Sequence, residues 1–267
     1  MKLFTIGGDD RMKWKDIPII DEVGLDEEGI ISAKKMFESR KKLMLPTHIV
    51  TALVLFDNSP SPEILSRSKE FFSFVAASSV LPQYIYDDKI VVAYSPLGGP
   101  AAGGLVEELL AFGIKKIVAC GSSGLIGDFQ SNKFLIVTKA IRDEGLSYYY
   151  LKPSIYVDTD SDQNKMIEDE FKKRKLEYGK GITWTTDAFY RETRSRMDKR
   201  INQGAVAVEM ECASIASVCK FRSIPFSQVL YFSDIVKQEE WSDFLDTRAS
   251  IKEKINNILL EIVMSLK

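Results

Sequence analysis

Two acidic residues close one of the apolar runs of this sequence. Glu209 and Glu211 flank Met210 directly after the residues AVAV. In a strand, residues two apart point to the same side, so both carboxylates are expected to face one place. A carboxylate at the end of a hydrophobic strand is costly to bury unless something binds it. The pair therefore indicates a ligand site at this strand end.

Other apolar runs also end in groups that can bind a ligand. Asp234 follows VLYFS and poses the same problem as the acidic pair. Gly121 closes the run KKIVACG, and Ser122 after it fits either a lining of small residues or a helix cap. Phe189 and Tyr190 follow GITWTTD closely and fit either a ligand-binding aromatic pair or core aromatics.

A glycine-rich turn, SPLGGPAAGG at residues 95–104, leads from the run KIVVAYS into an amphipathic stretch. Glycine permits unusual backbone angles, so the turn could be a tight connection only. It could also present N–H groups to an anion at the start of a helix. It is neither a Walker loop nor GxGxxG. Because no dinucleotide fingerprint follows the first strand, an unrelated Rossmann enzyme is disfavoured.

These groups need elements that position them. From residue 46 onward apolar runs alternate with amphipathic stretches, which is typical of a sheet with helices on both faces. Such sheets bind ligands beyond the carboxyl ends of their strands, where the groups above would converge. The expected strands are 49–56, 89–95, 115–121, 134–141, 181–187, 205–210 and 227–233. The expected helices are 61–74, 100–112, 161–177, 193–203, 211–221 and 247–266.

The predicted fold class is therefore α/β, as a single-domain three-layer α/β/α architecture around a central mixed, largely parallel sheet. A chain of 267 residues is long enough for one such domain. Residues 46–267 are expected to form it. Residues 1–45 mix short apolar patches with acidic turns, and we expect an N-terminal extension packed on the core, or an arm that binds a partner.

The charge balance, the first residues of the sequence and the length of the apolar runs argue against several kinds of partner. The 36 Lys and Arg nearly balance 38 Asp and Glu, which leaves no basic surplus for nucleic acid or an anionic membrane surface. The start, MKLFTIGGDDR, becomes charged too early for a signal peptide, and no apolar run approaches the ~20 residues of a membrane helix. We expect a cytoplasmic protein that binds neither nucleic acid nor membrane.

Metal and disulfide chemistry are disfavoured by residue type. His48 is the single histidine, which excludes an HExxH site and any cluster of several histidines. Cys120, Cys212 and Cys219 are too few and too scattered for a disulfide framework. No metal site is predicted.

Three segments together resemble the nucleoside phosphorylase family, which includes the hexameric purine nucleoside phosphorylases, the uridine phosphorylases and the methylthioadenosine nucleosidases. They are VEMECASIASV at 208–218, TTDAFY at 185–190 and FSD at 232–234. KKIVACGSSGLIGD resembles the family's glycine-serine turn, and AIRDEGLSYYYLKP resembles a segment of its uridine-phosphorylase-like branch. The resemblance covers roughly residues 46–235 and implies a phosphorylase/hydrolase-like fold.

The resemblance implies how a nucleoside would be held. Glu211 would hydrogen-bond the ribose 2′- and 3′-hydroxyls, Met210 would pack on the sugar, and Glu209 would support this site. Phe189, with Tyr190, would contact the base.

The resemblance also implies the chemistry. Asp234 would give a proton or a hydrogen bond to purine N7 as the glycosidic bond breaks, so its carboxyl group must keep a proton near neutral pH. Gly121 and Ser122 would lie near the nucleophile, which is a phosphate or a water. His48 would reach the 5′-hydroxyl in a neighbouring subunit. A homo-oligomer, dimer or hexamer, is implied, with no metal or organic cofactor and with inorganic phosphate as co-substrate.

Two arginines that bind phosphate in the family's phosphorylases are missing here. The sequence after the first strand reads FDNSPSPEIL, with no arginine before Arg67, and Ala119 stands two residues before Gly121. A phosphate dianion needs several cationic donors, with arginine as the usual bidentate partner. The cations that could replace the missing pair are Arg142, Arg191, Lys116 and the basic run at 40–42.

Three functions therefore remain open. The first prediction is phosphorolytic cleavage of the N-glycosidic bond of a ribonucleoside, which releases the free base and ribose 1-phosphate. A nucleosidase that uses water would follow from the lost arginines, and a non-catalytic nucleoside-binding protein would keep the ribose contacts without turnover. Asp234 favours a purine, whereas the segment RDEGLSYYY favours uridine.

Overall fold

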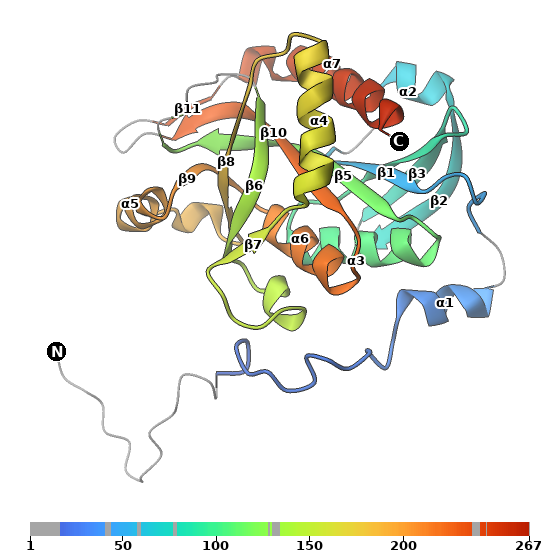
Figure 1. The fold of residues 1–267 in the computed structure, drawn as a ribbon, viewed down its shortest axis with the longest axis horizontal. Helices are drawn as coiled ribbons and strands as arrows, with labels where there is room; N and C mark the ends of the chain where they lie inside the picture. Colours follow the sequence, from blue (N-terminus) through green and yellow to red (C-terminus); the bar gives the residue numbers. More distant parts are fainter. Residues whose placement is uncertain are drawn as a thin grey trace.

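The computed structural model describes residues 17–40, 44–57, 60–76, 79–127, 129, 134–236, 241–243 and 245–266. For residues 39–40, 76, 79, 234–236, 241–243 and 245–251 it describes the backbone alone. Figure 1 shows the strands in the middle of the molecule, helices around them, and the N-terminal segment along one side.

The strands are, in chain order, β1 (Thr51–Leu55), β2 (Ser68–Ala76), β3 (Ser79–Tyr86), β4 (Ile90–Tyr94), β5 (Lys116–Leu125), β6 (Phe134–Asp143), β7 (Tyr156–Asp158), β8 (Tyr178–Thr186), β9 (Ala205–Glu209), β10 (Phe226–Val236) and β11 (Trp241–Asp243). The α-helices are α1 (Ala33–Arg40), α2 (Pro62–Ser66), α3 (Gly99–Ala111), α4 (Ser161–Lys173), α5 (Arg194–Asn202), α6 (Cys212–Phe221) and α7 (Leu245–Ser265). Each of the seven expected strands is confirmed.

The described strands form one mixed sheet of eleven strands. Parallel pairs join β1 to β4 and β5, β5 to β10, and β8 to β6 and β9. Strand β10 pairs with both β5 and β6, so β5, β9, β8, β6 and β10 form a closed circuit of paired strands. The α/β class and the mixed sheet are confirmed, and the closed circuit goes beyond the open sheet that the pattern predicts.

Side chains of the central strands alternate between two apolar cores. In β5, Ile117 and Ala119 pack in the core that includes α3 and α6, whereas Val118 and Cys120 pack in the core that includes α4 and α7. Strands β1 and β4 are buried along their whole length, as their continuous apolar runs predict. Each fully buried Val, Leu or Ile contributes about 1.5–3 kcal/mol, so the two cores hold the three layers together.

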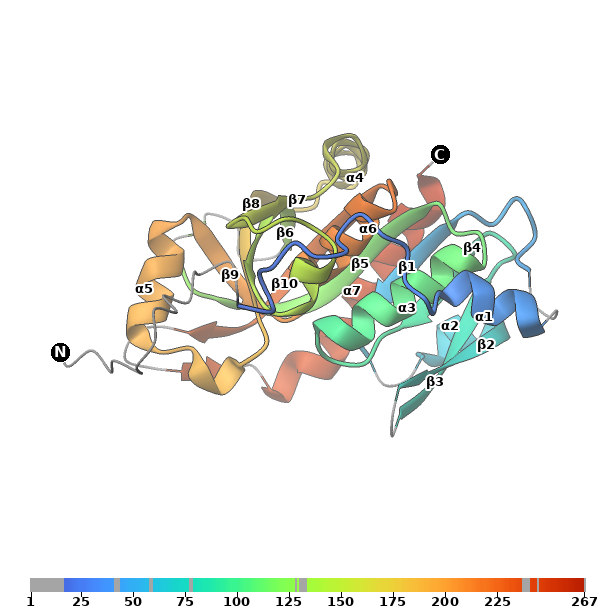
Figure 2. The ribbon, with the colours of Figure 1, turned by 90° about the horizontal axis from the view of Figure 1, so that it is seen from below.

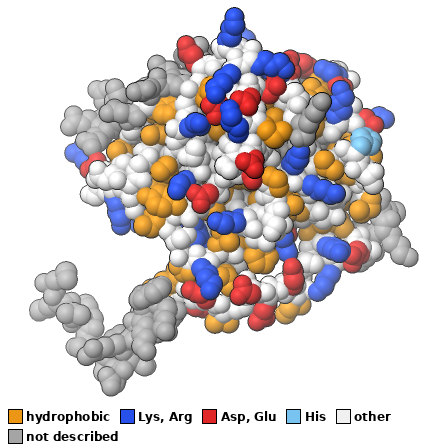
Figure 3. Space-filling view, viewed as in Figure 1, with side chains coloured by type: hydrophobic (Ala, Val, Ile, Leu, Met, Phe, Trp, Pro, Cys, Tyr) orange, Lys and Arg blue, Asp and Glu red, His pale blue; other side chains and the backbone are white. Residues whose placement is uncertain are grey.

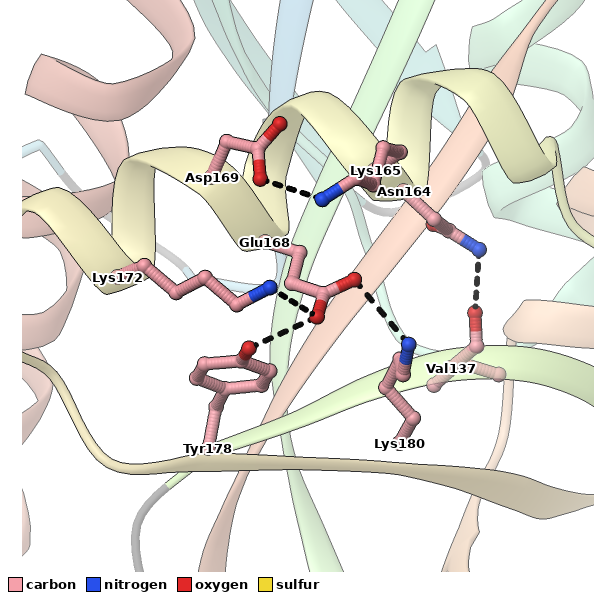
Figure 4. Close-up of polar contacts among 8 residues, drawn as sticks. All are labelled: Val137, Asn164, Lys165, Glu168, Asp169, Lys172, Tyr178 and Lys180. Carbon is pink, nitrogen blue, oxygen red and sulfur yellow. Dashed lines mark hydrogen bonds and ion pairs between the residues drawn. The ribbon is translucent and has the colours of Figure 1, made fainter.

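A charged cluster ties α4 to the start of β8 (Figure 4). Glu168 accepts hydrogen bonds from Lys172, Tyr178 and Lys180 at 2.8, 2.9 and 3.1 Å. The bonds from the two lysines and from the tyrosine lower the pKa of Glu168 to about 2. On the face that includes this helix, basic and acidic side chains are interspersed rather than separated by sign (Figure 3).

The described part of the N-terminal segment lies along the side that carries α3 and α6 (Figure 2). Helix α1 packs on α3, where the ring of Phe37 lies 4.3 Å from the ring of Phe112. Arg222, just after α6, pairs with Glu28 of this segment at 2.7 Å and with Glu107 of α3 at 3.1 Å. These contacts hold residues 17–40 against the domain.

The helix predicted over 61–74 is wrong for most of its length. Helix α2 ends at Ser66, and β2 begins at Ser68. Phe72 and Phe74 are buried while Val75 is 64% exposed, which is the two-residue period of a strand. Strand β2 pairs antiparallel with β3, which contains Pro82 opposite Ser73. Proline weakens a strand pattern, so β3 was not expected. Strands β2, β7 and β11 were not expected either.

Candidate active site

Glu209 fixes the junction between β9 and α6. Its Oε2 accepts the backbone N–H groups of Glu211 and Cys212 at 2.8 and 2.7 Å. Its Oε1 accepts the hydroxyl of Thr185 on β8 at 2.6 Å. The carboxylate therefore satisfies two N–H groups that the first turn of a helix leaves unpaired, at the positive end of the helix dipole.

Glu211 is the N-cap residue of α6, and it is only 5% exposed. Its Oε1 accepts the backbone N–H of Gly98 at 2.6 Å. Gly98 has a φ of +95°, which glycine adopts without strain. The glycine-rich turn therefore reaches the acidic pair, and the structure brings together two features that the sequence placed on different strands.

Burial makes both acidic residues hard to ionise. Burial raises the pKa of Glu209, and the hydrogen bond from Thr185 opposes part of this rise. Burial, followed by the negative charge of Glu209, raises the pKa of Glu211 to about 8. The Gly98 N–H lowers this pKa in part, and the charge of Asp187 raises it further. Glu211 therefore changes its protonation state close to neutral pH.

Two further carboxylates occupy the same rim. Asp187, after β8, accepts the backbone N–H of Gly145 at 2.8 Å. Glu144, after β6, is 5% exposed and accepts the hydroxyl of Ser214 on α6. The sequence analysis missed Glu144 and Ser214, although Glu144 carries the signal that identified Glu209, a carboxylate at the end of a buried strand.

The two predicted base-binding aromatics lie at the surface. Phe189 is 46% exposed and Tyr190 is 89% exposed, and their ring centroids are 4.0 Å apart. The interpretation as core aromatics is therefore wrong. Both belong to a short 3-10 turn, Phe189–Arg191, two residues beyond Asp187. Met210 is half-buried between the two glutamates in the chain.

Gly121 and Ser122 lie inside β5 rather than in a turn. The strand continues to Leu125, so the predicted turn and the helix-cap interpretation of Ser122 are both wrong. A Cβ on Gly121 would stand 2.7 Å from the ring of Phe56, which explains a glycine at this position by close packing. Ser122 is half-buried.

The strand register places the backbone of Asp234 in line, across the sheet, with the residue that precedes Glu209. Asp234 is opposite Gly124 of β5, and Gly124 is opposite Val208 of β9 on its other side. A register shift between Phe232 and Asp234 marks a bulge in β10, a feature that re-aims side chains and is frequent beside active sites. The side chain of Asp234 lies outside the described residues, so its acid role stays a prediction.

Arg142 is engaged in holding a loop. Its Nε donates to the Ser147 hydroxyl at 2.9 Å, and its four terminal N–H groups donate to acceptors in the segment 147–154. A guanidinium group has five N–H donors, and all are used. This arrangement leaves Arg142 no donor for a phosphate and does not support the predicted phosphate role.

The other predicted polar residues lie elsewhere. His48 precedes β1, and its Nε2 lies 2.9 Å from the carbonyl oxygen of Asp88, at the opposite end of β1 from the carboxyl rim. Lys116 begins β5 and is also at an amino end. Arg191 is exposed beside Tyr190. Of the run 40–42, only the backbone of Arg40 lies within the described residues.

The described ranges contain neither a metal-binding cluster nor a membrane-spanning helix. No group of three or more His, Cys, Asp or Glu side chains there is arranged to hold a metal ion. No helix there combines the length and the apolar character needed to cross a membrane.

Comparison with known proteins places this chain in a family. A profile of the phosphorylase superfamily matches residues 68–264. Uridine phosphorylase of Haemophilus influenzae is 28% identical over 131 residues, which span 49% of this chain and 49% of that protein. Aminodeoxyfutalosine nucleosidase of Helicobacter pylori strain J99 is 25% identical over 199 residues, which span 69% of this chain and 86% of that protein.

Solved structures share the fold. A 5′-methylthioadenosine/S-adenosyl homocysteine nucleosidase of Helicobacter pylori superposes with a TM-score of 0.67 at 20% identity, over 83% of this chain and 100% of that chain. The futalosine hydrolase of the same species superposes with a TM-score of 0.66 at 20% identity, over 82% of this chain and 99% of that chain. The matched profile covers most of the chain, and the chain belongs to the phosphorylase superfamily.

Proposed function

We propose that this chain cleaves the N-glycosidic bond of a ribonucleoside and that water accepts the ribosyl group. The observation that carries the proposal is the buried carboxyl group of Glu211, held by the Gly98 N–H on a rim of carboxylates. A carboxylate accepts several hydrogen bonds at once, so Glu211 can take both hydroxyls of a ribose while it keeps the bond from Gly98. A carboxylate rim also stabilises the positive charge that grows on ribose as the bond breaks.

The base would leave toward the exposed aromatic pair. Phe189 and Tyr190 offer ring faces at the surface, next to Asp187. Aromatic rings stack on or edge against a heterocycle, and a half-buried Met210 can adapt to the sugar. Asp234 would neutralise the departing base, as the family resemblance implies.

Water rather than phosphate follows from the charges on this rim. Four carboxyl groups, those of Glu144, Asp187, Glu209 and Glu211, lie at the neighbouring ends of β6, β8 and β9. A phosphate dianion there would be repelled by each of these carboxyl groups that is ionised, whereas a neutral water would not. In addition, Lys252 pairs with a carboxylate of this chain, since its Nζ lies 2.7 Å from a carboxylate oxygen of Asp57 after β1.

Phosphorolysis is the second candidate, and one observation favours it. Arg191 is an exposed cation directly after the aromatic pair. If phosphate is the acceptor, Arg191 is the residue of the predicted set that would bind it. Non-catalytic nucleoside binding is the third outcome.

The test is base release from a panel of nucleosides in the presence and absence of phosphate. The panel contains adenosine, inosine, uridine, 5′-methylthioadenosine and aminodeoxyfutalosine, with sulfate as the control anion. We expect release of the base and of the free sugar, unsubstituted or with its 5′-group, in phosphate-free buffer, at a rate that phosphate does not raise. Release that requires phosphate and yields ribose 1-phosphate would establish phosphorolysis instead. Binding of a nucleoside without release of any base would contradict both reactions.

Three further expectations belong to this proposal. We propose a homo-oligomer, which light scattering on the purified chain would test. We propose that the reaction needs no metal or organic cofactor, so base release should survive dialysis against EDTA. We propose that neither nucleic acid nor membrane takes part.

A further inference from the structure

The start of α3 fits against α6 through a residue that must be glycine. An ideal Cβ on Gly99 would overlap the hydroxyl oxygen of Ser214 and would stand 3.5 Å from Oε2 of Glu144. Ser214 is fully buried, and Glu144 is 5% exposed. Any larger residue at position 99 must displace this buried pair. The tip of the glycine turn therefore rests directly on the Ser214 hydroxyl.

Ser214 bonds across to a different element rather than back into its own helix. A buried serine inside a helix can donate to the carbonyl four residues earlier, but Ser214 donates to Oε2 of Glu144. The same carboxylate accepts the backbone N–H of Ser147 at 3.1 Å. The hydroxyl is thus held in one orientation by a residue at the end of β6.

The loop that carries Glu144 is itself fixed on three sides. Arg142 binds the segment 147–154 through all its donors, and the Gly145 N–H is bound by Asp187. A Cβ on Gly103, one turn along α3, would overlap Leu146 of this loop. Gly99 and Gly103 therefore share the face of α3 that packs on the loop. These contacts fix Glu144 in place beside Ser214.

The first turn of α6 touches the glycine turn at two points. Glu211 accepts the Gly98 N–H, and Ser214, three residues later, contacts Gly99. Gly98 and Gly99 are adjacent in the chain. A change in the position of the Ser214 side chain therefore shifts Gly99, and with it the Gly98 N–H that reaches Glu211. We propose that Ser214 and Glu144 are positioning residues, whose hydrogen bond seats Gly99 so that the Gly98 N–H binds the carboxyl group that holds the ribose.

The ionisable groups around Glu211 set the direction of the effect. Glu209 on β9 and Asp187 after β8 present negative charge to it, and the thiol of Cys212 on α6 is buried beside it. Among the contacts described for Glu211, the Gly98 N–H favours the ionised form most, followed by the backbone of Met210. Loss of this bond raises the pKa of Glu211 and weakens its bond to a ribose hydroxyl.

The helix offers matched controls. Ser217, one turn after Ser214 in α6, is equally buried, and its hydroxyl has no hydrogen-bond partner within the described structure. A Cβ on Gly104 would meet Phe74 at an ordinary distance of 3.6 Å. Ser217→Ala therefore controls for Ser214→Ala, and Gly104→Ala controls for Gly99→Ala.

The experiment measures Glu211 directly and then measures activity. In protein labelled with ¹³C at the glutamate carboxyl carbon, the Glu211 signal is assigned by its absence in Glu211→Gln and titrated from pH 5 to 10. We expect Ser214→Ala and Gly99→Ala to move the midpoint upward by about half a pH unit to one unit, and the two controls to leave it unchanged. The KM for the ribonucleoside rises roughly tenfold in the first two variants with a smaller change in kcat, because a bond to a charged group is weakened.

The possible failures are distinguishable. If Ser214→Ala lowers the melting temperature but leaves the midpoint at its wild-type value, the pair is structural only and the inference is overturned. The activity readout alone rests on the proposed function. If the wild-type chain releases no base from any nucleoside, the proposed function fails, while the titration still decides on the positioning role.

Discussion

The backbone N–H of Gly98 donates to Oε1 of Glu211 across 2.6 Å, although 113 positions separate the two residues in the sequence. This bond joins the turn after β4 to the start of α6. A buried carboxyl group with backbone donors at Gly98 and Met210 and acidic neighbours can accept further hydrogen bonds from a ligand.

Replacement of Glu211 should remove the discrimination of the sugar. Glu211→Ala is expected to lower kcat/KM for a ribonucleoside by about tenfold to a hundredfold, because a hydrogen bond to a charged group is lost. The loss for the matching 2′-deoxynucleoside should be smaller. Steady-state kinetics on the pair of substrates checks this, with the exposed Glu253→Ala as control. Equal losses on both substrates would exclude contact with the 2′-hydroxyl.

Stability should depend on pH through the same residue. The pKa of Glu211 is raised from 4.5 to about 8 in the folded chain, so between these values the folded state holds a proton that the unfolded state has released. The free energy of unfolding should therefore fall as pH rises across this window and level off above about pH 8. Urea unfolding of wild type and Glu211→Gln at pH 5 and pH 8.5 measures it. An identical decrease in both proteins would falsify the assignment.

Arg142 should act on stability rather than on phosphate binding. Arg142→Lys cannot reproduce five donors in a planar arrangement, so we expect the free energy of unfolding to fall by about 3–5 kcal/mol. Arg191→Lys, at an exposed position, should cost less than about 0.5 kcal/mol. Chemical unfolding compares the two. A stable Arg142→Lys protein with a raised KM for phosphate would instead support the phosphate role that the sequence suggested.

Two threonines beside Glu209 should differ sharply. The Thr185 hydroxyl donates to Glu209 at 2.6 Å and accepts the Ala213 N–H at 3.0 Å, whereas the Thr183 hydroxyl lies 3.4 Å from Glu209. Thr185→Val removes the partner of the Ala213 N–H and the shorter of the two hydroxyl bonds to Oε1 of Glu209, and it should cost about 2–4 kcal/mol. Thr183→Val should cost less than about 1 kcal/mol. Thermal unfolding of the two isosteric variants checks the difference, and similar melting temperatures would contradict the network described for Glu209.

The strands that carry the site could be predicted because they are buried on both faces. Continuous runs such as TALVL in β1 and IVVAY in β4 have few alternatives to a covered strand. The predicted helix over 61–74 included FFSF of β2, because a helix does begin at Pro62 and the change at Arg67 has no strong local signal. Pairing with β3 decides the conformation there, and this contact is not local in the sequence.

The acidic site was predictable in part for the same reason. Glu209 and Glu211 stood out because carboxylates rarely end an apolar run, and the structure places both of them in the described rim. The sequence could not predict that Glu209 binds the N–H groups at the start of α6 while Glu211 binds Gly98, since this depends on which N–H groups α6 leaves unpaired. A turn was expected at Gly121 because KKIVACGSSGLIGD resembles the family's glycine-serine turn, yet the ring of Phe56 requires a residue without a side chain inside β5. Arg142 was assigned to phosphate by its charge, and only the loop 147–154 shows where its donors go.

The closed circuit of β5, β9, β8, β6 and β10 has a consequence for how the chain opens. A strand in a ring of pairings cannot be peeled from an edge, because each has two neighbours. The hairpin of β2 and β3 lies at the end of the sheet and can separate after the loss of one neighbour, β4. Amide deuterium uptake should therefore begin in β2 and β3, while the ring strands, which carry the rim, exchange together in a single slow step.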